Sequence, residues 1–322
     1  MNLKKKDKIF VAGHNGMAGS AIIRGLRKHG YENIITINRN QLDLEVQSKV
    51  NNFFKKNKIT FVFLCAAKVG GIYANDNYPA DFIAKNLSIQ SNIIDAAFKN
   101  KIKKLIFLGS SCVYPRISNR KIKESDLLTN KLELTNEPYA VAKISGIKMC
   151  ESYNRQYNTD YRSLMPTNMF GPGDNYHPMN SHVMAALIRK FIIAKRKNQK
   201  SVVVWGTGRP KREFLYVDDF ADAAVYLAKM SKKKYSSFIN ERLSHINIGY
   251  GRDYSIKTIA NMIRKSTGFN GKIVYDKSKK DGVKKKLLDN KLIRSMGWKP
   301  KHKLEKILNN YILSIKNNIN FK

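Results

Sequence analysis

The chain has 322 residues, of which 43% are hydrophobic and 26% are charged. These proportions are typical of a globular protein, so they exclude a wholly disordered chain, a collagen and a coiled coil. Lys and Arg number 60 against 24 Asp and Glu, which gives a formal net charge of +36. The lysines form short runs along the whole chain, whereas nucleic-acid-binding proteins usually concentrate charge on one arm or face. We therefore expect no specific nucleic-acid partner.

Membrane and metal sites are not expected either. No stretch approaches the roughly 18 uninterrupted apolar residues of a membrane-spanning helix. The basic start of the chain is followed by an apolar run at 9–12 that is too short for a signal sequence. The three cysteines, Cys65, Cys112 and Cys150, have the spacing of neither a disulfide framework nor a zinc site. We expect a cytoplasmic protein without a metal.

The first half of the chain alternates short apolar runs with helical patterns. In chain order, the pattern predicts a strand at 9–12, a helix at 17–29, a strand at 33–37, a helix at 47–56, a strand at 60–67, a helix at 80–99, a strand at 105–109, a helix at 139–157 and a strand at 161–165. Near-continuous apolar strands separated by helices predict a parallel sheet covered on both faces. The predicted fold class is therefore α/β, with a doubly wound parallel sheet.

After residue 170 the pattern loosens, and prolines and glycines gather at 171–178. The predicted elements are, in chain order, a helix at 182–197, strands at 201–205 and 214–217, a helix at 217–229, a strand at 245–248, a helix at 255–266, a strand at 272–275 and a helix at 304–315. We expect a larger domain at 1–170 and a smaller α/β part at 171–322 that closes over a cleft. Some segments of the smaller part should return to the first domain.

Three glycines, Gly13, Gly16 and Gly19, lie where the first predicted strand passes into the first predicted helix. Glycine permits a tight turn and a close approach of the backbone to a diphosphate, and the helix N-terminus supplies free N–H groups. Three glycines alone are weak evidence, but this position favours a dinucleotide site. The second strand ends at Asn38-Arg39 without the acid typical of NAD sites, and arginine can bind a 2′-phosphate bidentately. The sequence favours NADP(H), although a surface arginine is the plain alternative.

Tyr139 and Lys143 are four residues apart at the start of a predicted helix and therefore share one face. Reduction of a ketone needs a proton donor at the oxygen, and we expect the ammonium of Lys143 to lower the pKa of Tyr139 toward neutral pH. Ser110 follows the strand at 105–109, so its hydroxyl can bind the same oxygen. A lone Tyr-x-x-x-Lys occurs often by chance, but these three residues together predict a reductive site.

Cys112 lies just beyond the same strand, where ligands of parallel sheets bind, although free cysteines are usually packing residues. His182 follows a polar segment at 174–181 that suits a loop lining the cleft, although a lone histidine is more often structural.

Trp205 and Arg212 place an aromatic ring and a fixed cation near one another, which suits a nucleotide diphosphate. A core tryptophan and a surface salt bridge are the alternative for this pair.

Together these motifs resemble the extended short-chain dehydrogenase/reductase family, and within it the enzymes that epimerise and reduce a GDP-bound 4-keto sugar. The resemblance extends from about residue 9 to residue 298. Its specific stretches are Gly-His-Asn-Gly-Met at 13–17, Ala-Ala-Lys-Val-Gly-Gly-Ile at 66–72, Phe-Leu-Gly-Ser-Ser-Cys at 107–112, Thr-Asn-Glu-Pro-Tyr-Ala at 135–140, Asn-Ser-His-Val at 180–183 and Arg-Glu-Phe-Leu at 212–215.

The resemblance implies conversion of GDP-4-keto-6-deoxy-D-mannose to GDP-L-fucose, with epimerisation at C3 and C5 and NADPH-dependent reduction at C4. The implied catalytic residues are Ser110, Cys112, Tyr139, Lys143 and His182, of which Cys112 and His182 serve the epimerisations. The implied NADP(H) contacts are Gly13, His14, Asn15, Gly16, Met17, Ala18, Gly19, Arg39, Leu108, Gly109, Ser110, Ser111, Lys143, Pro166, Thr167, Asn168, Met169 and His182. The implied sugar-nucleotide contacts are Lys190, Trp205, Arg212 and Asp281. A homodimer joined through the helices at 81–99 and 139–157 is also implied.

Two alternatives remain open. Another sugar-nucleotide epimerase or dehydratase of the same fold would retain bound NAD, and a dehydratase would need an acidic pair near Ser111, where the sequence has Ser-Cys-Val. A non-catalytic protein that binds NADP or polyanions would not need the intact set of Ser110, Tyr139 and Lys143. The residues themselves do not indicate a preference for guanine.

Overall fold

A parallel sheet of six strands forms the centre of the larger part of the molecule. The computed structural model describes residues 3–279, 281–317, 319 and 321. The strand order is β2-β1-β3-β4-β5-β9, and each neighbouring pair is parallel. The strands are β1 Ile9–Ala12, β2 Ile34–Ile35, β3 Phe61–Leu64, β4 Lys104–Leu108, β5 Tyr161–Pro166 and β9 Ile246–Ile248. The predicted doubly wound sheet is confirmed.

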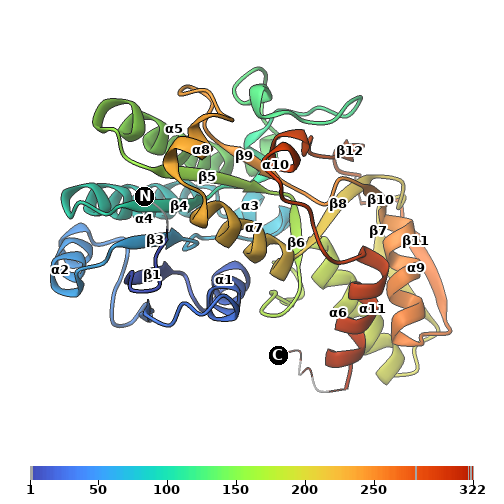
Figure 1. Cartoon of the computed structure of the whole chain (residues 1–322). Coiled ribbons are helices and arrows are strands. Elements are labelled where there is room, and N and C mark those ends of the chain that lie inside the picture. The colour runs from blue at the N-terminus through green and yellow to red at the C-terminus, as the bar shows by residue number, and fades with distance from the viewer. Residues whose placement is uncertain (1–2, 280, 318, 320, 322) are drawn as a thin grey trace.

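Helices cover both faces of this sheet (Figure 1). They are α1 Met17–Lys28 and α7 Val217–Lys229 on one face, and α2 Gln47–Asn57, α4 Pro79–Lys99 and α5 Glu137–Tyr157 on the other. Successive side chains of a strand point to opposite faces, so Ile9 and Val11 join the α1 cluster while Phe10 and Ala12 join the α2 cluster. Both faces are buried, which explains why the strands are almost continuously apolar.

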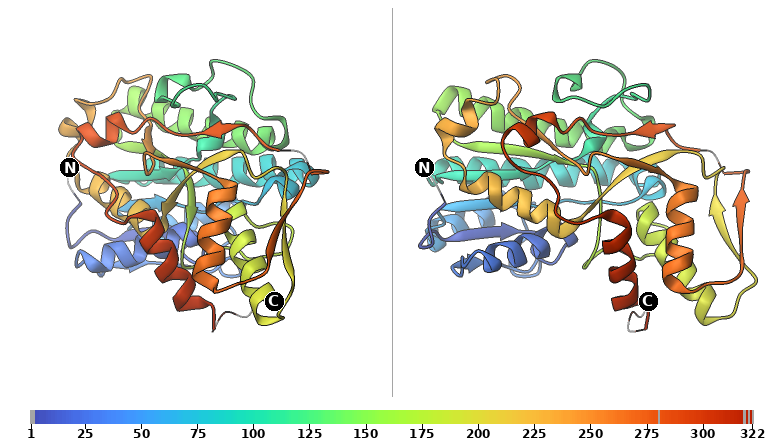
Figure 2. Two further views of the ribbon diagram at one scale, coloured as in Figure 1. Left: turned by 90° about the vertical axis from the view of Figure 1, so that its right-hand side faces the viewer. Right: turned by 45° about the vertical axis from the view of Figure 1, so that its right-hand side comes forward.

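The smaller part of the molecule has its own core and two small sheets. Its strands are β6 Asn168–Phe170, β8 Lys211–Tyr216, β10 Asp253–Ser255 and β12 Lys285–Lys286 in one sheet, and β7 Ser201–Trp205 and β11 Lys272–Asp276 in the other. Its helices are α6 Val183–Arg196, α9 Ile256–Thr267 and α11 Leu304–Ile315. These helices bury a third hydrophobic cluster. Figure 2 shows β7 and β11 side by side at the outer edge of this part.

Two segments beyond residue 170 belong to the layers of the large sheet. The strand β9 pairs with β5, where Leu164 lies opposite Ile246. The helix α7 packs against α1, and its buried side chains join the α1 cluster. Trp298, near the end of the chain, is buried in the same cluster. The domain boundary near residue 170 stays a prediction, because the chain crosses between the two parts several times.

The short elements were not predicted by the sequence pattern. They include the helices α3 Ile72–Asn77, α8 Lys232–Ser236 and α10 Lys291–Ser295, and the strands β6, β10 and β12. An element of two to six residues has too few positions to show a period, and its place is fixed by its partners. The strand β8 begins at Lys211 rather than at residue 214 because β12 pairs with it from that residue.

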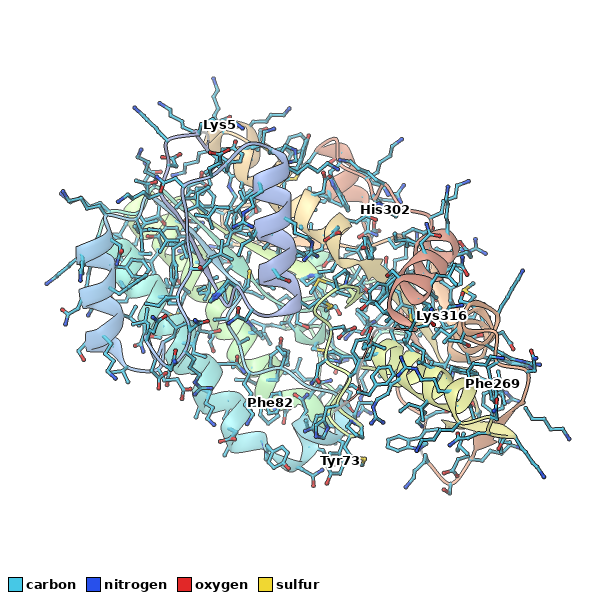
Figure 3. All side chains as sticks on the ribbon, turned by 90° about the horizontal axis from the view of Figure 1, so that it is seen from below. Lys5, Tyr73, Phe82, Phe269, His302 and Lys316 are labelled. Atoms are coloured by element: carbon cyan, nitrogen blue, oxygen red, sulfur yellow. The ribbon has the colours of Figure 1, made fainter. Side chains whose placement is uncertain are left out.

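Within the described part of the chain, no helix is both long and apolar enough to cross a membrane. The same residues contain no group of three or more His, Cys, Asp or Glu side chains that could hold a metal ion. In the side-chain view of Figure 3, Tyr73 of α3 lies at the rim of the molecule and Phe82 of α4 lies further in. Tyr73 is exposed and Phe82 is buried.

Candidate active site

Gly13 and Gly19, at the turn from β1 into α1, leave no room for a side chain. Gly13 has φ +84°, and a Cβ atom there would lie 2.6 Å from the backbone nitrogen of Ala66. A Cβ atom on Gly19 would collide with the carbonyl oxygen of Gly13. The helix α1 begins at Met17 after Gly16, with no capping side chain and no acid in its first turn. A tight turn that ends in an uncapped helix N-terminus fits a diphosphate.

Arg39 lies next to this turn. The side chain of Asn15 in the turn donates a hydrogen bond of 2.9 Å to Oδ1 of Asn38, in the loop that follows β2. The guanidinium of the adjacent Arg39 is largely exposed, and its Nη2 lies 2.6 Å from Oε1 of Glu45. A cation beside the glycine turn fits the 2′-phosphate of NADP(H). The sequence pattern did not predict the ion pair of Arg39 with Glu45.

Ser110 and Tyr139 meet at the carboxyl end of β4. Ser110 begins a short 3-10 helix, and its Oγ accepts a hydrogen bond of 3.2 Å from the backbone N–H of Cys112. Tyr139 lies in the first turn of α5 behind Pro138, with its hydroxyl group beside the side chain of Ser110. The ring of Phe82, labelled in Figure 3, packs edge-on against that of Tyr139, with 6.1 Å between the centroids.

Lys143 is almost fully buried below Tyr139. Its Nζ donates a hydrogen bond of 2.8 Å to the carbonyl oxygen of Leu108, and lies 6.0 Å from the centroid of the Tyr139 ring. Burial lowers the pKa of Lys143 to about 8, because the charged form loses hydration. The ammonium is thus anchored to the strand end and lies on the same side of α5 as the phenol.

The pKa of Tyr139 shifts in the direction opposite to our expectation. Burial raises the pKa of Tyr139, the nearby Cys112 adds to the rise, and the hydrogen bond with Ser110 opposes it. The sequence pattern shows that Lys143 is near, but it does not show how strongly the phenol is desolvated. The phenol therefore keeps its proton at neutral pH, which is the form that a proton donor needs.

Cys112 differs from the other two cysteines. Burial raises the pKa of Cys65 and of Cys150 to about 12, so both remain thiols. Cys112 is partly exposed, as is Cys65, but it differs in having the Nζ of Lys286 3.6 Å from its Sγ. A negative charge on this sulfur would therefore have a cation beside it. Lys286 is opposite Arg212 in the pairing of β12 with β8, so the two cations share one edge of the site.

His182 directly precedes α6, in a loop that lies against the segment after β3. The backbone N–H of Gly71 donates a hydrogen bond of 2.9 Å to the carbonyl oxygen of Asn180. A Cβ atom on Gly71 would lie 2.5 Å from the carbonyl oxygen of Ser181. His182 is exposed to solvent at the rim of the site, and partial desolvation by the surrounding protein lowers the pKa of its imidazole.

The segment 166–169 crosses from the large sheet to the small one. Pro166 is the last residue of β5, and Asn168 and Met169 begin β6. Thr167 Oγ1 and Asn168 Nδ2 donate hydrogen bonds of 3.2 and 3.0 Å to the carbonyl oxygen of Glu213. Leu108, Gly109 and Ser111 lie on the neighbouring end of β4. The predicted contacts with the nicotinamide half of the cofactor thus lie at adjacent strand ends.

The predicted sugar-nucleotide contacts gather in the smaller part. The Nζ of Lys190 lies 5.0 Å from the centroid of the Trp205 ring, which is 49% exposed. Asp281 accepts a hydrogen bond of 2.8 Å from the backbone N–H of Thr207, two residues after Trp205. Arg212 Nη1 donates one of 2.6 Å to the carbonyl oxygen of Val283. The segment 281–283 therefore connects Trp205 with Arg212.

Glu213 is a buried acid that the sequence pattern did not single out. Its Oε1 accepts hydrogen bonds from the backbone N–H of Gly251 at 2.6 Å and from Asn290 Nδ2 at 3.3 Å, and its Oε2 accepts one from the backbone N–H of Leu288 at 3.0 Å. The carboxylate thus connects β8, beside Arg212, with the loops at Gly251 and at 288–290. No signal in the local sequence reveals this role, because all three donors are distant in the chain.

The loss of one acceptor oxygen at Glu213 should weaken the fold measurably. Glu213→Gln replaces one oxygen with an amide nitrogen that faces a backbone N–H, so a buried donor is left unpaired. We expect the free energy of unfolding to fall by roughly 1–3 kcal/mol. Urea denaturation measures this change, and Glu241→Gln, at an exposed site, is the matched control. An unchanged midpoint for Glu213→Gln would show that both oxygens are dispensable.

The comparisons with known proteins identify the family of the chain. The model of the NAD dependent epimerase/dehydratase family matches residues 9–249. A GDP-L-fucose synthase of Escherichia coli (strain K12) is 51% identical over 293 residues, which cover 91% of this chain and 91% of that protein. Both findings confirm the resemblance to extended short-chain dehydrogenases/reductases.

Two solved structures share the fold over nearly the whole chain. A GDP-6-OMe-4-keto-L-xylo-heptose reductase from C. jejuni has a TM-score of 0.92 and 36% identity, over 99% of this chain and 100% of that one. A GDP-L-fucose synthetase from Naegleria fowleri bound to NADP has a TM-score of 0.88 and 26% identity, over 99% of this chain and 95% of that one. The chain belongs to the NAD dependent epimerase/dehydratase family, and its sequence places it with the GDP-L-fucose synthases.

Proposed function

We propose that the chain converts GDP-4-keto-6-deoxy-D-mannose to GDP-L-fucose with NADPH. The observation that carries this proposal is the meeting of Ser110, Tyr139 and Cys112 at one strand end, with Lys143 behind them. The set combines a proton donor for a carbonyl oxygen with a thiol that can act at carbon. The Escherichia coli relative, which is 51% identical, bears the name of this activity.

Epimerisation uses the acidity of the hydrogens at C3 and C5, which flank the C4 carbonyl. Inversion needs a base on one face of the sugar and an acid on the other. We assign these roles to Cys112, beside Lys286, and to His182, on the loop that lies against Gly71. Ser110 and Tyr139 donate hydrogen bonds to the carbonyl oxygen and stabilise the negative charge that develops on it.

Reduction uses the same oxygen. When bound, NADPH supplies a hydride to C4. Tyr139 then gives its proton to the oxygen, and the raised pKa of Tyr139 ensures that this proton is present. The buried ammonium of Lys143 stabilises the phenolate that remains. The hydrogen bond of 2.8 Å from Lys143 Nζ to the carbonyl oxygen of Leu108 fixes the distance between the cation and the strand end.

The cofactor and the substrate contact opposite sides of this site. The glycine turn at 13–19 holds the diphosphate of NADP(H), and Arg39 holds its 2′-phosphate. The nicotinamide half is contacted by residues at the strand ends and beside them: Leu108 to Ser111, Lys143, Pro166 to Met169 and His182. Lys190, Trp205, Arg212 and Asp281 hold the GDP group. The exposed face of Trp205 offers a surface for stacking, and the guanidinium of Arg212 suits the diphosphate.

We further propose a cytoplasmic homodimer. The two longest helices, α4 and α5, pack against each other on one face of the sheet, and their outer sides carry exposed Ala84 and Val141. Such a surface is suited to a four-helix contact with a second copy. The three cysteines are free thiols, as is usual in a reducing compartment.

Product identification tests the proposed function. The purified chain is incubated with GDP-4-keto-6-deoxy-D-mannose and either NADPH or NADH, and the sugar is identified by NMR. We expect GDP-L-fucose, one NADPH oxidised per sugar, and slower turnover with NADH because Arg39 binds the 2′-phosphate. An unepimerised 6-deoxy-hexose would indicate a simple reductase. Intact NAD+ released on denaturation would favour another epimerase or dehydratase, and salt-sensitive DNA binding without turnover would favour a polyanion-binding protein.

A further inference from the structure

The loop that joins the second strand to α2, at 38–46, is fixed by a series of hydrogen bonds. The backbone N–H groups of Gln41 and Leu42 each donate a bond of 3.0 Å to the carbonyl oxygen of Asn38. Asn92 Nδ2, from α4, donates one of 2.9 Å to the carbonyl oxygen of Leu44. The backbone N–H of Glu45 donates one of 3.0 Å to Oδ1 of Asp43. The position of Glu45 is therefore set by the fold.

Within this loop Arg39 forms an ion pair with Glu45, at 2.6 Å between Nη2 and Oε1. The side chain of Arg39 is 72% exposed, whereas that of Glu45 is only 25% exposed. The acid is therefore the better-anchored partner, and the arginine is the one that can move. The carboxylate draws the guanidinium toward α2 and occupies one of its two terminal nitrogens.

A 2′-phosphate needs the same guanidinium. It carries nearly two negative charges at neutral pH and binds arginine best through two parallel hydrogen bonds. It must either displace the carboxylate of Glu45 from Nη2 or bind beside it, and in the second case the two anions repel each other. The neutral 2′-hydroxyl of NAD(H) leaves the ion pair with Arg39 intact. Glu45 thus weakens the binding of NADP(H) but not the binding of NAD(H).

We propose that Glu45 is a specificity-determining residue that competes with the 2′-phosphate of NADP(H) for Arg39 and so reduces the preference for NADP(H) over NAD(H). The proposal rests on the proposed function only in requiring that this site binds NADP(H). Exposed ion pairs are weak, so the competition costs the cofactor little. The acid adjusts the preference and does not reverse it.

Equilibrium binding to the cofactor-free protein tests this proposal. Glu45→Gln keeps the size of the side chain and removes its charge. Calorimetric titration at low salt should show NADP+ binding about 3- to 10-fold more tightly to the variant, with NAD+ unchanged within about twofold. The gain should shrink at high salt, because the charges are screened. Glu32→Gln, at an exposed site before the second strand, removes the same charge away from Arg39 and should leave both affinities unchanged.

The possible outcomes test the competition by Glu45 and the proposed function separately. NADP+ binding that is unchanged or weaker in Glu45→Gln would overturn the competition, and a weaker affinity would mean that Glu45 instead orients Arg39 for the phosphate. An equal gain in Glu32→Gln would attribute the effect to net charge and also overturn it. If the unmodified chain binds no NADP+, the proposed function fails together with this inference. If it binds NADP+ and only the Glu45 effect is missing, the inference alone fails.

Discussion

Tyr139→Phe is expected to reduce the rate of ketone reduction at least roughly 100-fold, which is the usual effect of losing a general acid. The substitution removes one oxygen and keeps the ring that packs edge-on against Phe82. The Ser110 hydroxyl remains near the substrate oxygen, but serine is too weak an acid to replace a phenol. Lys143 is tied to the carbonyl oxygen of Leu108 and lies below the ring, so it stabilises charge without delivering the proton directly.

The measurement is the single-turnover rate of NADPH oxidation, followed by absorbance, together with calorimetric binding of NADP+. We expect the rate to fall and the affinity to stay within about twofold, because the lost oxygen is not needed to hold the cofactor. Tyr157→Phe removes a phenol at the exposed far end of the same helix and is the matched control. A near-normal rate in Tyr139→Phe would mean that another group protonates the oxygen.

The parts of the site that were predicted from the sequence are those in which the signal is local. Gly13, Gly16 and Gly19 lie within seven residues of one another, where β1 passes into the first turn of α1, and the structure forms the expected tight turn there. Tyr139 and Lys143 are one helical turn apart, so their spacing alone places them on one face. Five of the six strands of the large sheet were predicted for the same reason, since β1 to β5 and their helices follow one another in the chain, whereas β9 joins β5 from the second half.

The parts that were missed depend on pairings between distant segments. Lys286 comes close to Cys112 only because β12 pairs with β8 in a register that puts Lys286 opposite Arg212. In the sequence it is one lysine of a basic run in a chain with 60 Lys and Arg. Glu213 contacts donors near residues 250 and 290, which no spacing rule connects. The pKa of Tyr139 was predicted in the wrong direction because burial depends on the whole fold.

Cys112→Ser should separate epimerisation from reduction. Both reactions share the C4 oxygen, but only epimerisation needs a base that removes a proton from carbon. Thiols ionise near the physiological range, whereas a serine hydroxyl is far too weak an acid to become an alkoxide there. The Nζ of Lys286 lies 3.6 Å from the sulfur and stays in place in the variant. The variant keeps Ser110, Tyr139 and Lys143, so hydride transfer should continue.

We therefore expect Cys112→Ser to convert the keto sugar slowly into an unepimerised 6-deoxy-hexose. The measurement is the uptake of solvent deuterium at C3 and C5, together with the identity of the product. Cys150→Ser makes the same atomic exchange at a buried thiol, whose pKa burial raises to about 12, and should keep wild-type deuterium uptake. His182→Gln should also reduce the uptake, because the second face of the sugar then lacks its proton-transfer group. Normal deuterium uptake in Cys112→Ser would assign the base to His182 or to another residue.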